Sequence, residues 1–173
     1  MKVTSDGYTI DFLNAIQAYK FDETNKNSPY YHGLSHCMKA IDIYVEYEDK
    51  ILFVEIKDYS SILREIENEQ NAFWQKVQNN LIQKFRDSFL YCWAESKSNI
   101  ENIYYIVCLQ GLPKNREFFS FPGFRKKLCE HLPFFNVPSR WKKQLLKGCF
   151  VVSLDYWKNE NKPLFSLFPI AVS

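Results

Sequence analysis

Apolar and polar residues alternate along Asp42–Lys57, on both sides of a central Glu48-Asp49. A period of two residues is typical of a β-strand, so this stretch predicts a β-hairpin whose turn lies near Glu48-Asp49. The turn contains no glycine, so a tight two-residue turn and a four-residue loop over 47–50 remain alternatives. Both have the same centre, and in either case Asp42 faces Glu55 across the hairpin.

The same alternation divides the side chains of the hairpin between two faces. Six apolar residues share the face that we expect to be buried: Ile41, Ile43, Val45, Leu52, Val54 and Ile56. The other face places Asp42, Glu55 and Lys57 together at the open end, with Tyr44 and Phe53 beside them. The pattern therefore predicts two carboxylates and one lysine in a single cluster.

Two facing carboxylates repel each other, and burial of either one without a partner is unfavourable. A divalent cation between Asp42 and Glu55 would remove this conflict. Oxygen ligands, with the Ile56 carbonyl as a candidate third, suit Mg²⁺ or Mn²⁺. Lys57 would lie beside the metal, where it can orient an attacking water or help to deprotonate it. The alternative is a surface hairpin with a solvated Glu55–Lys57 pair worth about 0–1 kcal/mol; the large apolar neighbours of Glu55 favour a central strand instead.

The remaining pattern predicts helices and strands in alternation. A short amphipathic helix is expected over Tyr8–Tyr19, and a long helix follows Lys57 and runs to about Trp93. A buried strand is expected over Ile103–Leu109, followed by helices over Phe124–His131 and Arg140–Lys147 and a last strand over Cys149–Leu154. This order predicts an α/β protein, a three-layer α/β/α sandwich with a central mixed sheet, in which the strands ending at Lys57 and starting at Ile103 are parallel.

The composition favours one domain over residues 1–173, with enough apolar residues for a proper core. Hydrophobic residues make up 46% and aromatic residues 17% of the chain, so we expect some Phe and Tyr to line a groove or a partner surface. The five cysteines form no CxxC pair, the first residues lack an apolar signal-peptide core, and no apolar run approaches a membrane span. These features predict a reduced, cytoplasmic setting and no membrane partner.

The net charge of +2 is unevenly distributed along the chain. The segment from Asp42 to Glu69 has nine acidic against three basic residues, whereas Gly111 to Phe150 has nine basic against two acidic residues. An acidic centre beside a basic half fits a metal site flanked by a phosphate-binding surface. Two solvated helix faces are the alternative explanation of the charge pattern.

The residues Asp42…Glu55-Ile56-Lys57, within apolar strands, resemble the motif of the PD-(D/E)XK nucleases, which have the restriction-endonuclease-like fold. The resemblance covers Lys39–Asp58 and otherwise rests on the order of elements; Ile41 stands where the name-giving proline would be. It implies a metal held by Asp42, Glu55 and the Ile56 carbonyl, with Lys57 as the catalytic lysine. An acid from a first helix often joins such sites, and the candidates are Asp11 and Glu23.

The leading hypothesis is a Mg²⁺- or Mn²⁺-dependent nuclease, with an endonuclease and DNA favoured and defence against foreign DNA as a first guess at its role. Target choice would come from a partner subunit or from DNA shape, and a protein partner or a homo-oligomer is expected. The alternative is a catalytically weak subunit of the same fold that binds nucleic acid or protein. The basic residues expected to contact the nucleic-acid backbone are Arg116, Arg125, Lys126, Lys127, Arg140, Lys142 and Lys143.

Overall fold

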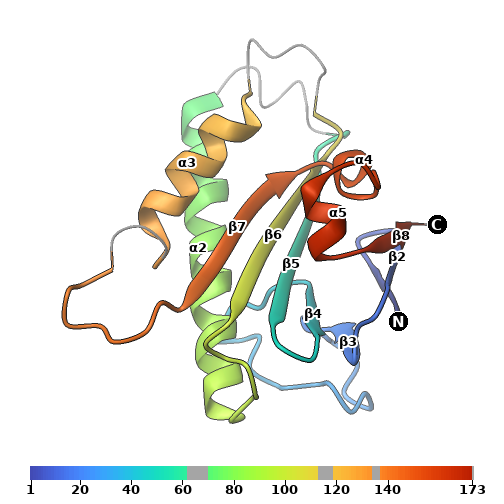
Figure 1. The fold of residues 1–173 in the computed structure, drawn as a ribbon, viewed down its shortest axis with the longest axis vertical. Helices are drawn as coiled ribbons and strands as arrows, with labels where there is room; N and C mark the ends of the chain where they lie inside the picture. Colours follow the sequence, from blue (N-terminus) through green and yellow to red (C-terminus); the bar gives the residue numbers. More distant parts are fainter. Residues whose placement is uncertain (62–69, 113–118, 134–136, 173) are drawn as a thin grey trace.

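A five-stranded sheet with the order β3-β4-β5-β6-β7 forms the centre of the protein (Figure 1). The computed structural model describes all residues except 62–69, 113–118, 134–136 and 173. The central strands are β3 (Gln17–Lys20), β4 (Ile43–Glu46), β5 (Ile51–Asp58), β6 (Ile103–Gln110) and β7 (Leu146–Val152). The pairs β3–β4 and β4–β5 are antiparallel, whereas β5–β6 and β6–β7 are parallel. The predictions of a mixed α/β protein with a mixed sheet, and of parallel pairing after Lys57, are therefore confirmed.

Different elements cover the two faces of this sheet. On one face lie α2 (Gln70–Ala94) and α3 (Phe121–His131), and on the other lie α4 (Leu154–Trp157), α5 (Pro163–Leu167) and a small antiparallel sheet (Figure 1). The small sheet has the order β1-β2-β8, with β1 over Lys2–Ser5, β2 over Tyr8–Phe12 and β8 over Ile170–Val172. Each side has its own apolar cluster, one under α2 and α3 and one under the small sheet, α4 and α5. The second covering layer is thus largely β-structure and not a layer of long helices.

The hairpin of β4 and β5 has the predicted register. Ile43 pairs with Val54 and Tyr44 with Phe53, and the two strands are joined by residues 47–50. One part of the face assignment is wrong: Ile41 lies in the cluster under α2 together with Tyr44 and Phe53, because β4 begins only at Ile43. The hairpin is also buried on both faces, since β5 is the middle strand and both faces of the sheet are covered.

The predicted helix over Tyr8–Tyr19 is wrong, because this segment forms β2 and β3. The turn between β1 and β2 is Asp6-Gly7, and both residues have positive φ, 49° and 81°. Asp-Gly is a strong signal for a tight hairpin turn, and it shifts the preceding and following residues into strands. The hairpin then pairs through β2 with β8 near the end of the chain.

The predicted helix over Arg140–Lys147 is also wrong, whereas β6, α2 and α3 agree with their predictions apart from their ends. The start of the predicted long helix falls on residues 62–69, outside the described part of the chain. Gly148 lies within β7, where a Cβ atom would come within 2.8 Å of the Tyr104 ring. Close packing of β7 against β6 therefore explains this glycine. None of the described helices has the length and apolar character needed to cross a membrane.

Candidate metal centre

Asp42 and Glu55 lie side by side at the end of the β4–β5 hairpin, and both are buried. Asp42 directly precedes β4, and its main chain is held on both sides: its N–H donates to Val54 O and its carbonyl accepts from Phe21 N. Its side-chain Oδ2 accepts a hydrogen bond of 2.7 Å from Ile56 N. The Asp42 carboxylate is therefore fixed against β5, beside the fully buried Glu55.

Two lysines contact this carboxylate pair. Lys57, on β5, has its Nζ 2.7 Å from Glu55 Oε1 and 3.6 Å from Asp42 Oδ2. Lys84, on α2, has its Nζ 2.9 Å from Asp42 Oδ1, 2.7 Å from Glu55 Oε1 and 2.9 Å from Glu55 Oε2. The Lys84 ammonium thus bridges the two carboxylates. Asp6 Oδ2, in the first hairpin turn, lies 3.8 Å from Lys57 Nζ on the outer side of the cluster.

The environment shifts the pKa values of two of these groups. Burial, with the nearby Asp42 charge, raises the pKa of Glu55 to about 7, and the two lysines only partly oppose this shift. Burial acts to lower the pKa of Lys57, but Glu55 and Asp42 outweigh it and raise that pKa above its ordinary value. Lys57 is therefore a protonated ammonium group at neutral pH. In this state it donates hydrogen bonds and positive charge and does not accept a proton.

The oxygens of this cluster fit a small divalent cation. Glu55 Oε1 is buried and receives no well-directed hydrogen bond, although both ammonium groups are close to it. Because the N–H and C=O of a strand residue point to the same side, the Ile56 carbonyl lies on the Asp42 side of β5. Among the described residues, no group of three or more His, Cys, Asp or Glu side chains is arranged to hold a metal ion. Two carboxylates and one carbonyl suit Mg²⁺, which keeps several waters.

A cavity of about 270 Å³ opens beside the carboxylate pair. Its lining residues come from β5 and the residue after it, from α2 and from the segment before β4: Lys39, Glu55, Lys57, Tyr59, Val77, Asn80, Leu81 and Lys84. At its rim Lys39 Nζ donates to Asn80 Oδ1 at 2.6 Å. The cavity therefore gives solvent access to Glu55 and to both of its lysine partners, whereas Asp42, which Lys84 also contacts, is not among the lining residues.

The helix α2 also positions the chain that leads to Asp42. Ser88 Oγ accepts a hydrogen bond of 3.0 Å from Ile41 N, and Asp87 Oδ2 accepts one of 3.0 Å from Lys39 N. Both side chains are buried. One helix therefore holds this segment in two ways: Asp87 and Ser88 bind the main chain of Lys39 and Ile41, and Lys84 binds the side chain of Asp42.

We expect Ser88→Ala to lower the free energy of unfolding by about 1–3 kcal/mol, because the buried Ile41 N–H loses its acceptor. The better helix propensity of alanine offsets only about 0.5 kcal/mol. Urea unfolding measures the change. The matched control is Ser98→Ala, which removes only an exposed hydrogen bond to Glu46; an equal small effect of both substitutions would contradict a positioning role for Ser88.

Lys84 was not among the residues predicted for the site, although the sequence contains a signal for it. It lies three residues after Leu81 and seven after Val77, on the face of α2 that packs on the sheet. A lysine at such a position needs an acidic partner, because an unpaired buried charge is strongly unfavourable. The candidate acids from the first part of the chain lie elsewhere: Asp11 pairs with the N-terminal ammonium, and Glu23 accepts from Asn25 N in a loop.

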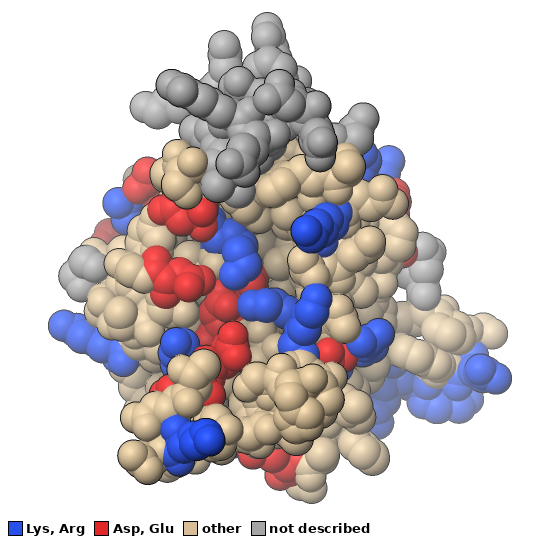
Figure 2. Space-filling model, turned by 180° about the vertical axis from the view of Figure 1, so that it is seen from behind, with Lys and Arg blue, Asp and Glu red and all other residues tan. Residues whose placement is uncertain are grey.

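The predicted nucleic-acid-binding residues are not gathered at the cavity. Arg116 lies outside the described residues, and Arg125 points inward, where its Nε donates to Cys149 O at 2.6 Å. Lys126 and Lys127 are exposed on α3, and Arg140 is exposed in the segment before β7. On the face shown in Figure 2, acidic side chains form a strip bordered by basic ones, so this face has no continuous basic surface.

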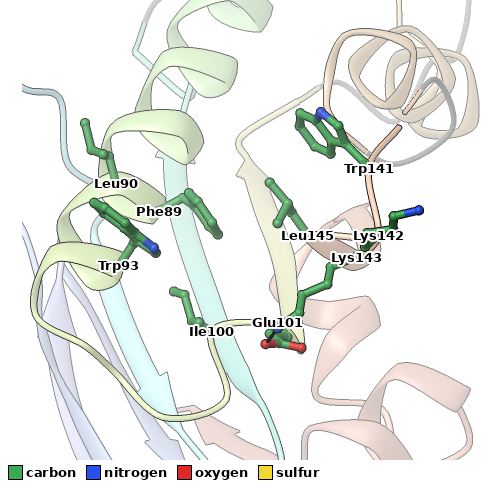
Figure 3. A pocket seen from close by; sticks show the side chains of 9 residues that line it. All are labelled: Phe89, Leu90, Trp93, Ile100, Glu101, Trp141, Lys142, Lys143 and Leu145. Atoms are coloured by element: carbon green, nitrogen blue, oxygen red, sulfur yellow. Dashed lines mark hydrogen bonds and ion pairs between the residues drawn. The ribbon is translucent and has the colours of Figure 1, made fainter. Parts of the chain in front are cut away.

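Lys142 and Lys143 line a second, larger cavity of about 640 Å³ (Figure 3). Its walls are mainly apolar, with Trp93 on the α2 side and Trp141 opposite. Lys143 is ion-paired with Glu101. Both tryptophans are substantially exposed, so aromatic side chains reach the surface at this cavity.

Comparisons of the chain with protein-family models, with curated proteins and with solved structures find no significant match. The geometry of the site is therefore the basis for a functional assignment.

Proposed function

We propose that this protein is a metal-dependent nuclease related in its site to the PD-(D/E)XK nucleases, with a restriction-endonuclease-like core. The observation that carries the proposal is the juxtaposition of Asp42, Glu55 and Lys57 on the β4–β5 hairpin, beside a cavity. A buried carboxylate with a raised pKa beside a like charge and a cleft is a frequent feature of functional sites. The covering of β5 by α2 and its parallel pairing with β6 support the proposed fold relationship.

In this proposal Asp42 and Glu55, with the Ile56 carbonyl, hold Mg²⁺ or Mn²⁺. The bound ion would act as a Lewis acid toward the phosphodiester. Lys57 is 35% exposed and protonated, so it can donate a hydrogen bond to the attacking water or to a phosphate oxygen. Ile56 N–H keeps the Asp42 carboxylate in place through its hydrogen bond to Oδ2. The role of Lys57 is therefore orientation and charge stabilisation.

One observation favours a second candidate, a catalytically weak subunit of the same fold. Two lysines already neutralise the two carboxylates, so the cluster is balanced in charge without a metal. A purely structural ion-pair cluster under α2 would look the same. The large apolar cavity beside α2 would then be the more important surface, as a contact for protein or nucleic acid.

The experiment that separates the two candidates is a cleavage assay with labelled single-stranded DNA, duplex DNA and RNA, each with Mg²⁺, Mn²⁺ or EDTA. We expect cleavage of at least one substrate with metal and none with EDTA. Asp42→Asn should abolish it, because one metal-ligand charge is lost. A protein that binds a substrate and never cleaves it would support the weak subunit.

The basic residues on α3 and before β7 are expected to contribute to binding of nucleic acid through its phosphates. We expect Lys126→Glu/Lys127→Glu and Lys142→Glu/Lys143→Glu each to weaken binding several-fold without unfolding, because these side chains are exposed. Affinity of the wild type should also fall steeply between about 50 and about 200 mM salt. Fluorescence anisotropy with a labelled oligonucleotide measures both effects.

The control for this experiment is Lys158→Glu/Lys162→Glu, on the opposite side of the sheet near α4 and α5. It makes the same change in net charge and should retain most of the affinity for the oligonucleotide. Equal losses in all three double variants would assign the effect to net charge alone, and no loss in any would remove these lysines from the interface.

A further inference from the structure

The ammonium group of Lys84 lies between the two carboxylates that the proposed function assigns to a metal. It is within 2.9 Å of an oxygen of Asp42 and of both oxygens of Glu55, whereas Lys57 Nζ is within 3 Å of Glu55 Oε1 alone. The Lys84 side chain is only 15% exposed. Of the two lysines, Lys84 is therefore the one with the geometry of a bridging cation.

A divalent cation cannot join this arrangement without changing it. When both carboxylates are ionised, they and the two lysines together carry no net charge, so an added metal would leave two excess positive charges in a buried cluster. Asp42 and Glu55 would hold the metal, and Lys84 already contacts Asp42 Oδ1 and both oxygens of Glu55. One ammonium group must move away, and Lys84 is the one that occupies the shared position.

The neighbouring cavity gives Lys84 a place to go. The side chain already lines this cavity of about 270 Å³, with Asn80 one helical turn earlier and Lys39 across the rim. A lysine side chain has a flexible four-carbon stem, so its ammonium group can leave the carboxylates without movement of α2. The displaced charge would then stand in the cavity beside Lys39, where an anionic phosphate group would be attracted.

We propose that Lys84 is a built-in competitor of the metal: it holds Asp42 and Glu55 together in the metal-free protein and is displaced into the cavity when the divalent cation binds. This inference rests on the proposed metal site. It assigns to Lys84 a positioning role that lowers metal affinity and stabilises the metal-free protein.

The test uses Mn²⁺ alone as the probe, without nucleic acid, and isothermal titration calorimetry on the full chain. Lys84→Met should bind Mn²⁺ about tenfold or more tightly than the wild type, because no ammonium group then competes for the two carboxylates. In EDTA, Lys84→Met should also have a lower melting temperature than the wild type. Added Mn²⁺ should raise the melting temperature of Lys84→Met more than that of the wild type. Lys39→Met, which removes a charge from the same cavity without a contact to the carboxylates, is the matched control and should change the affinity much less.

A second measurement needs no variant and covers the case in which Lys84→Met does not fold. Amine-specific acetylation followed by mass spectrometry reports the accessibility of each lysine in the wild type. Lys84 should react slowly in EDTA and faster with Mg²⁺, whereas Lys126, exposed on α3, should react equally in both.

The outcomes distinguish this inference from the proposed function. Equal Mn²⁺ affinity in wild type and Lys84→Met, or metal-independent labelling of Lys84, would overturn the inference and leave the nuclease proposal intact. Tighter binding by Lys84→Met that is lost again in the double variant with Asp42→Asn supports the inference, even if the wild type cleaves nothing. Failure of both proteins to bind Mn²⁺ would overturn both proposals.

Discussion

Lys57→Ala is expected to reduce metal-dependent cleavage by about 100-fold or more while metal binding persists. The Lys57 ammonium stands at the mouth of the carboxylate cluster and is not itself a metal ligand. Removal of a positioned donor of charge and hydrogen bonds in such a site usually has an effect of this size. Loss of a positive charge 2.7 Å from Glu55 should, if anything, strengthen the binding of Mn²⁺. Single-turnover cleavage and Mn²⁺ calorimetry on the same preparation measure the two properties.

The control for this prediction is Lys50→Ala, because Lys50 precedes β5 at the other end of the hairpin and pairs with Asp49. It should keep both cleavage and metal binding. If Lys57→Ala loses metal binding together with cleavage, Lys57 acts by holding Glu55 in place. If cleavage persists undiminished, the activity belongs to other residues or to a contaminant.

In metal-free buffer, ionisation of Glu55 should contribute a loss of about 3 kcal/mol to the stability of the wild type as the pH rises from about 4.5 to about 7. The pKa of Glu55 is raised from 4.5 to about 7 in the folded protein, so between these values the folded state binds a proton that the unfolded state has released. Stability therefore falls through this window and is constant above it as far as Glu55 is concerned. Lys57 does not change the stability with pH in this window. Its pKa is raised in the folded protein, so its stabilising contribution is fully present at every pH below its ordinary value of 10.5.

Glu55→Gln isolates this effect, because glutamine cannot titrate. Urea unfolding in EDTA at intervals between pH 4.5 and 7.5 should give a variant whose stability falls less with pH than that of the wild type. Glu48→Gln, at the exposed hairpin turn, should keep the wild-type slope. Parallel curves for wild type and Glu55→Gln would mean that Glu55 stays ionised across the range, with its charge fully compensated by Lys57 and Lys84.

Several features of the fold follow from local patterns in the chain. Alternation along 42–57 predicts the hairpin register, because a shift by one residue would exchange the side chains of the two faces. The continuous apolar run over 103–109 has no polar face, so it forms a strand covered on both sides. The spacing of Phe73, Val77, Leu81 and Phe85 by four residues predicts α2, because residues four apart lie on one face of a helix. The meeting of Asp42 and Glu55 depends on neighbouring strands alone and is therefore predictable from the sequence.

Other features depend on contacts between distant segments. The segment over Arg140–Lys147 contains polar and apolar residues compatible with a helix, and the free edge of β6 decides that its end becomes β7. The segment Tyr8–Tyr19 becomes two strands because its partners, β8 and β4, come from elsewhere in the chain.

The composition of the candidate site shows the same division between local and tertiary information. The alternating pattern of the hairpin places Asp42, Glu55 and Lys57 on one edge of a strand pair. That the site also contains Lys84 depends on how α2 crosses the sheet and on its rotation about its own axis, which are set by the packing of its apolar face. The sequence alone thus determined the pair of carboxylates, and only the tertiary structure decided that a helix lysine bridges them.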